Sequence, residues 1–215
     1  KTSIGCVPDG ACSTTSVTTT SGSITMRALN NMTTASAIIN NGDGDPNGAY
    51  SYGNPSGGGL LSGNGAEVDA KANVTIDNQV SSNATLNAGG AIVMQSFSSA
   101  HADAQGYGVV IGGIAVGVIL TDANANGNLK TRMEGTISSG TNVTVETFAV
   151  NTADTTDNLL ATGSVFGGSG LNIEAHANPT INTFISGNVD SVTGNILVRT
   201  RSEGNADAEA QGINV

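Results

Sequence analysis

The chain has 215 residues and a formal net charge of −10, with 7 Lys plus Arg against 17 Asp plus Glu. This acidity repels phosphate backbones, so nucleic acid is excluded as a partner. Only 3% of the residues are aromatic and 30 are glycine, yet 38% are hydrophobic and alternate with polar residues, which argues against disorder. No apolar run reaches the roughly 18 residues of a membrane helix, so no transmembrane segment is expected.

Residues 1–16 are rich in Gly, Ser, Thr and Pro and are predicted to form an N-terminal leader or cap. They contain the only two cysteines, Cys6 and Cys12, separated by a loop with Pro8 and Gly10. Two cysteines alone are too few for a zinc site. Either a Cys6–Cys12 disulfide closes this loop, which implies an oxidising compartment, or both thiols are free.

From residue 17 onward the chain shows the period-two alternation of half-buried strands. One such segment, Ser21 to Ala28, recurs three times, and its aliphatic anchors are Ile24, Ile92, Val143 and Ile196. Successive anchors are 68, 51 and 53 residues apart. A fixed interval of this kind is typical of repeat architectures.

A second recurring motif is an acid followed by A-x-A-N. Its asparagines are Asn73, Asn126 and Asn178, which are 53 and 52 residues apart. Asn tolerates left-handed backbone conformations and forms ladders with its own copies, so these residues are interpreted as architecture. A third unit, Ala100 to Gly106, matches Ala206 to Gly212.

The first interval between anchors is longer than the others by about 15 residues. A polar segment rich in Gly, Asn, Asp and Pro accounts for the excess, and an inserted loop is predicted at residues 40–57. Within it, Asp43, Asp45 and Asn47 followed by Gly48 match the start of a Ca²⁺-binding loop. Asn54 replaces the bidentate Glu expected at the twelfth position, so a plain exposed loop is the alternative.

These patterns predict an all-β protein, a parallel β-helix (β-solenoid) built from repeats of about 52 residues over residues 17–215. No segment has the spacing of an amphipathic helix, and glycine is frequent throughout. Small inward Ala and Val would fill a narrow core without aromatic residues. Because a period of 52 residues is long, it is expected to cover two to three coils.

The motifs G-x-[IV]-x-V, A-x-A, G-G and A-x-A-N-P-T-I over residues 17–215 resemble the repeats of very large bacterial surface proteins, including filamentous-haemagglutinin-like adhesins. The resemblance implies β-helical stalks or fibres in a secreted or cell-surface protein. It carries no catalytic motif.

Three other features each allow a general structural interpretation and a more specific functional one. The aligned acids Asp69, Asp122 and Glu174 form a widely spaced acidic stripe, which either keeps the protein soluble or bridges fibres through cations. The run from Asp122 to Gly127 also fits a calcium loop, but its alignment with the other repeats explains it better. The basic residues that are candidates for catalysis do not cluster with the acids, so an enzyme is not expected; these candidates are Lys71, Lys130, Arg132, Arg199 and Arg201.

The sequence therefore predicts a structural or adhesive extracellular module, a stalk or fibre subunit. Its last residues, from Gln211, stop partway through a repeat, and an open coil is expected to stack on another copy or on further repeats of a longer chain. The alternative is a β-helix that binds or degrades carbohydrate, with a host or matrix glycan as ligand. A groove lined by acids and Tyr50, Tyr52 or Tyr107 would favour that alternative.

Overall fold

The computed structural model describes residues 2–5, 14–40 and 45–214. Strands cover most of this part, and it contains no helix. All pairings between its named strands are parallel. The predicted all-β class with parallel sheets is confirmed.

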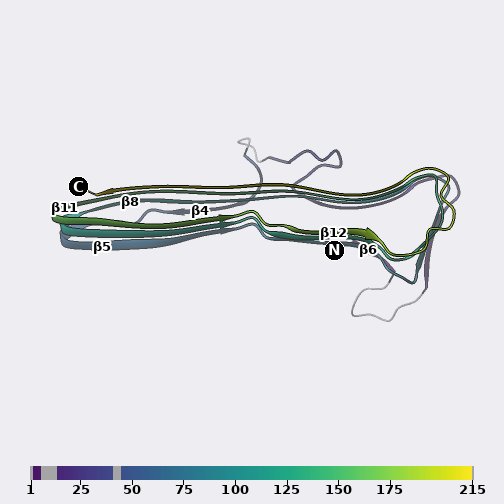
Figure 1. Cartoon of the computed structure of the whole chain (residues 1–215), viewed down its shortest axis with the longest axis horizontal. Coiled ribbons are helices and arrows are strands. Elements are labelled where there is room, and N and C mark those ends of the chain that lie inside the picture. The colour runs from purple at the N-terminus through teal and green to yellow at the C-terminus, as the bar shows by residue number, and fades with distance from the viewer. Residues whose placement is uncertain (1, 6–13, 41–44, 215) are drawn as a thin grey trace.

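The strands form three parallel sheets along one elongated body (Figure 1). The first sheet has the order β1-β6-β9-β12, the second β10-β7-β2, and the third β13-β11-β8-β3, with β4 and β5 also paired to β8. The strands are β1 (Thr2–Ile4), β2 (Thr15–Thr19), β3 (Ile24–Asn30), β4 (Ala49–Gly53), β5 (Ser56–Lys71), β6 (Val74–Val80), β7 (Ala84–Ala88), β8 (Ile92–Asn124), β9 (Gly127–Met133), β10 (Thr136–Ser139), β11 (Val143–His176), β12 (Thr180–Ile185) and β13 (Ile196–Asn214).

The chain runs repeatedly through the first, second and third sheets in this order, and we call each such circuit a pass. β6, β7 and β8 make one pass, and β9, β10 and β11 make the next. Residues that pair between neighbouring passes are one repeat interval apart in the sequence, for example Val74 with Gly127 and Asn128 with Thr180. One interval therefore corresponds to one pass, and the expectation of two to three coils per interval was wrong. The reason is the length of β8 and β11, which have 33 and 34 residues.

The four sequence anchors lie side by side in the third sheet. Ile24 and Val143 both pair with Ile92, and Val143 also pairs with Ile196. The first three are buried in the main core at the wide end of the body, whereas Ile196 is half exposed. Other members of this core include Met26, Met94, Val145, Leu86, Met133 and Ile137.

The long strands turn back on themselves at a tip formed by residues 57–62, 110–115 and 162–167, at the left of Figure 1. In β8 the turn falls at Gly112 and Gly113, where an added Cβ would lie 2.4 and 2.7 Å from backbone oxygens of the neighbouring turn. The part of each long strand that leads to the tip is its outgoing limb, and the part that leads back is its returning limb. Beyond the turn, Gly117 lies against Val110, so the two limbs pack face to face. We call the paired limbs of β8 and β11, together with β4, β5 and the part of β13 that pairs with them, the arm.

Small side chains make the core of the arm narrow, as the sequence predicts. Its alanines are almost fully buried; they are Ala70, Ala100, Ala102, Ala104, Ala123, Ala125 and Ala153. Closer to the tip, Val110, Ala115, Ile119 and Leu159 continue this core.

The extra residues of the first pass lie earlier than the predicted 40–57. Asn30 pairs with Ser98, and Ala49 pairs with Ala102, so residues 31–48 stand where the next pass has only 99–101. Residues 49–53 and 56–57 belong instead to β4 and β5. Likewise β1 and the start of β2 fall within the predicted N-terminal leader, where they pair with β6 and β7.

The sequence alignment of the two copies of the A-x-A unit differs by two residues from the pairing of the strands that contain them. Ala100 pairs with Asn151, which pairs with Gly204 and not with Ala206. A shift of two residues keeps every side chain on the same face of a strand, so sequence similarity alone does not detect it.

The A-x-A-N asparagines form the predicted ladder. The Asn73 side-chain oxygen accepts a hydrogen bond from the backbone N–H of Asn126 at 2.9 Å. The Asn126 oxygen accepts one from the backbone N–H of Asn178 at 2.7 Å. Asn73 and Asn126 thus each bind the counterpart one pass later, and all three asparagines lie just past the end of β5, β8 or β11, where the main chain leaves the third sheet.

Candidate functional site

All three tyrosines of the chain lie on one outer face of the arm, on β4 and β8. Tyr50 and Tyr52 pair with Asp103 and Gln105, and because side chains alternate along a strand, Tyr107 points the same way as those two partners. The Tyr52 and Tyr107 rings are 5.7 Å apart between centroids. Tyr50 donates a hydrogen bond to the Pro46 carbonyl at 2.6 Å.

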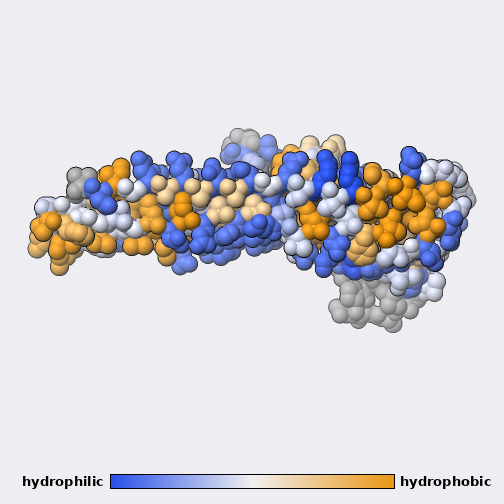
Figure 2. All heavy atoms as spheres, viewed as in Figure 1, coloured by the Kyte–Doolittle hydropathy of each residue, from blue (hydrophilic) through white to orange (hydrophobic). Residues whose placement is uncertain are grey.

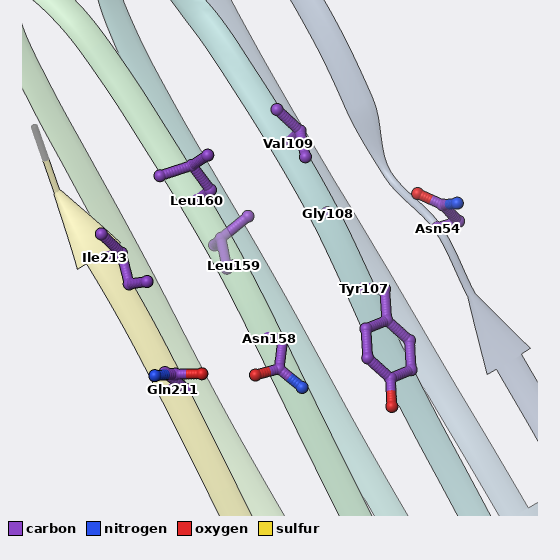
Figure 3. Close-up of a pocket in the computed structure, with 9 residues that line it drawn as sticks. All are labelled: Asn54, Tyr107, Gly108, Val109, Asn158, Leu159, Leu160, Gln211 and Ile213. Atoms are coloured by element: carbon purple, nitrogen blue, oxygen red, sulfur yellow. The ribbon is translucent and has the colours of Figure 1, made fainter.

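A shallow groove of about 300 Å³ continues this face toward the tip (Figure 3). Tyr107, Asn158 and Gln211 form one row across three neighbouring strands, and Val109, Leu160 and Ile213 form the next. Asn54 borders the groove beside Tyr107. The groove thus combines an aromatic ring, three side-chain amides and an apolar floor, and its lining residues include no Asp or Glu.

A row of acids borders the tyrosines on the side away from the tip. Asp103, Asp154 and Asp207 lie on adjacent strands, and Gln105 donates a hydrogen bond to Asp103 at 2.8 Å. Burial raises the pKa of Asp154; the nearby His101 opposes the shift, while the two flanking aspartates add to it. Burial, helped by Asp45 and Asp103, also raises the pKa of Tyr50. Both groups therefore hold their protons more tightly than in a free peptide.

The aligned acids Asp69, Asp122 and Glu174 lie on adjacent strands, on the returning limbs of the arm. Neighbouring strands are about 4.8 Å apart, so the row is close-packed and not the widely spaced stripe we expected. Each acid contacts the residue two positions on: Lys71 at 2.8 Å, Asn124 at 2.6 Å and His176 at 3.2 Å. These partners reduce the repulsion within the row.

Besides Lys71, three of the five basic residues named as catalytic candidates hold ion pairs within the framework, and one of these is Arg201, 3.6 Å from Glu146. Arg132 contacts Asp77 at 2.9 Å and Glu134 at 3.2 Å. Arg199 contacts the buried Glu146 at 2.6 Å. Arg201 lies 4.0 Å above the centre of the Phe148 ring. These contacts join neighbouring strands, which is a structural role.

The predicted calcium loop is only partly within the described residues, because Asp43 lies outside them. Asn47 donates a side-chain hydrogen bond to the Ile39 carbonyl at 3.0 Å, and its own carbonyl accepts one from Asn31 at 3.0 Å. Over the described ranges, no three His, Cys, Asp or Glu side chains are placed to share a metal ion. Cys6 and Cys12 also lie outside the described residues.

The groove brings together residues that sequence reasoning did not combine. The sequence motifs single out Tyr107 only as one of three tyrosines and Asn54 only as the twelfth position of the calcium-loop motif, and no motif points to Asn158 or Gln211. One available signal was the spacing: Tyr107, Asn158 and Gln211 are 51 and 53 residues apart, close to the repeat interval.

No protein-family model, curated protein or solved structure matches this chain. In the part of the chain that the structure describes, there is no helix of the length and apolarity needed to cross a membrane.

Proposed function

We propose that the chain is a β-solenoid module of about 52 residues per coil, acting as a stalk or fibre element of a secreted or cell-surface protein. The observation that supports this proposal is the register, in which residues one interval apart pair along β8 and β11 on both sides of an irregularity between Gly163 and Phe166. A body built in this way extends by adding further passes, since each pass contacts mainly its neighbours.

The two ends of the stack differ, which supports end-to-end growth. Ile24 and Met26 in the first pass are buried, but their counterparts in β13, Ile196 and Val198, are 52% and 45% exposed. Within residues 2–5, 14–40 and 45–214, β13 pairs only with β11, so its other edge carries backbone groups without a strand partner. Such an edge templates the pairing of another strand, either from another copy or from further repeats.

Self-stacking predicts a concentration-dependent assembly. At high protein concentration, negative-stain images should show rods several times the length of one molecule. Replacing Ile196 and Val198 by Lys should remove these rods, because charges would then lie at the exposed end of the core, where the next copy would pack. Leu197→Lys is the matched control, since Leu197 alternates with these two residues and points to the other face. Single particles of one length for the unmodified protein would contradict self-stacking.

The tyrosine face favours a second candidate function, the binding of a carbohydrate. A tyrosine ring packs against the apolar face of a sugar ring, and amides donate to and accept from its hydroxyl groups. The groove lined by Tyr107, Asn158 and Gln211 offers both kinds of contact on a flat, accessible surface. The neighbouring aspartates would repel acidic glycans, so the proposed ligand is a neutral host or matrix glycan.

Glycan binding through this face predicts that Tyr107→Ala lowers affinity by roughly tenfold or more. The measurement is binding to a glycan array, followed by titration calorimetry with the best ligand. Tyr50→Ala is the control, because it removes an exposed tyrosine outside the groove. Equal affinity of both variants and the unmodified protein would exclude the groove as the site.

Calcium binding by Asp43, Asp45 and Asn47 remains a proposal that rests on the sequence motif. It is tested by the melting temperature with and without Ca²⁺, which should differ only in the protein with intact aspartates.

A further inference from the structure

The tip of the arm exposes an unusual number of large apolar side chains. At its end, Leu60, Leu61 and Val165 are 84%, 75% and 80% exposed, and Phe166 is 58% exposed. Figure 2 shows hydrophobic residues gathered at this end of the body, on the left. Exposed apolar clusters of this kind mark surfaces that bind a partner or a membrane.

The apolar surface is not confined to the end of the tip. On the outgoing limb of β8, Val109 and Ile111 point outward and are exposed. On its returning limb, Ile114, Val116, Val118 and Leu120 alternate outward and are exposed as well. Because the two limbs pack face to face, these side chains lie on opposite outer faces of the arm. The apolar surface thus faces three directions: two sides and the end.

The same region carries no charge in a chain whose formal net charge is −10. Residues 54–66, 104–121 and 158–173 contain no Asp, Glu, Lys, Arg or His. The exposed acids nearest the tip are Glu67, which pairs with Leu120, and Glu209, which lies in the same row as Gln105. Asp103 and Asp122 follow further from the tip. Along the arm, the surface therefore changes from apolar at the tip, through Tyr107 and its neighbouring amides, to acidic.

We infer that the tip inserts end-on into the surface of a bilayer of neutral phospholipid. A second rigid copy would cover only one of the three apolar directions, whereas a fluid acyl phase contacts all three. The graded order of apolar, aromatic and charged residues follows the polarity of a bilayer from its interior outward. The net negative charge selects neutral over anionic lipid.

Insertion is shallow because the arm has open edges. Among the residues that the structure describes, β5 pairs only with β8, and the returning part of β11 also pairs only with β8. Unpaired backbone groups are not tolerated in the hydrocarbon interior, so the tip reaches only about 5–10 Å, to the boundary between headgroups and acyl chains.

The test uses vesicles of phosphatidylcholine and a fluorescent reporter. The chain has no Trp, so Phe166→Trp introduces a single reporter at the tip. On addition of vesicles its emission should shift to the blue, and bromine atoms placed near the headgroup end of the acyl chains should quench it more than those near the terminal methyl. Unchanged emission would overturn the inference.

Flotation with the same vesicles tests which residues bind. Replacing Leu60, Leu61 and Val165 by Asn in the Phe166→Trp protein should reduce the bound fraction by about tenfold or more. The control Ile39→Asn, which changes an exposed Ile away from the tip, should bind like the unmodified protein. Adding phosphatidylserine should weaken binding. Equal flotation of the Asn variant, or a lipid-free dimer that the same replacements dissociate, would overturn the inference.

Discussion

Appending a second copy of residues 163–215 directly after Val215 is expected to raise the melting temperature by roughly 5–10 °C. Asn214 pairs with Ala161, so the residue that follows Val215 corresponds in the sequence to Gly163. The added 53 residues would therefore continue the proposed coil in register and make one further pass. They would cover Ile196 and Val198, which are half exposed in the present last strand.

The control is an extension of the same length and composition with a scrambled order. It should leave the melting temperature unchanged, because its apolar residues would not align with the core residues of β13. Limited proteolysis gives a second measurement, since an added pass that folds on β13 should resist cleavage. If the ordered extension is digested as quickly as the scrambled one, the proposed growth by stacking is wrong.

Replacing Asp157 by Asn should stabilise the protein at pH 7 by about 1–2 kcal/mol. Asp157 is fully buried between the limbs of the arm. Thr121 donates a hydrogen bond to its Oδ1 at 2.5 Å, while Oδ2 has no hydrogen-bond partner among the described residues. Burial raises the pKa of this carboxyl; the hydrogen bonds from Thr121 and from the backbone of Gly106 oppose the shift. An ionised carboxylate is therefore costly at this position.

The sign of the pH dependence follows from the raised pKa. The native state binds the Asp157 proton more tightly than the unfolded chain, so the free energy of unfolding falls as the pH rises from about 4 through the native pKa. Asn does not titrate, so the advantage of Asp157→Asn should be present at pH 7 and nearly absent at pH 4. Chemical denaturation at both pH values measures it. Asp190→Asn, at an exposed site, should show no such difference. A variant that is less stable at pH 7 would contradict the argument.

The stacked polar side chains show how far a periodic sequence determines its own contacts. The spacing of Asn73, Asn126 and Asn178 predicts the hydrogen bonds between successive copies, and the structure contains them. The alternation around Ile24, Ile92 and Val143 predicts which side chains face the core, because successive side chains on a strand point to opposite faces. Both inferences need only local geometry and a constant interval.

The site required the tertiary structure, because its residues come from different passes. Tyr107, Asn158 and Gln211 meet only through the pairing of β8 with β11 and of β11 with β13. Tyr52 meets Tyr107 because residues 31–48 precede β4 and bring it into register with β8. A two-residue error in alignment, as in the A-x-A unit, leaves every face correct but assigns the wrong neighbours.

By itself, the sequence determined that the protein is all-β, that its sheets are parallel, and which residues alternate toward the core. These properties follow from short-range periodicity, which each segment carries independently. Only the tertiary structure decided that one interval makes one pass, that the long strands turn at Gly112 and Gly113, and that the apolar residues of the tip remain exposed. Period-two alternation is compatible with any number of turns per interval. The position of each turn depends on backbone contacts between passes, as between Gly112 and Gly59.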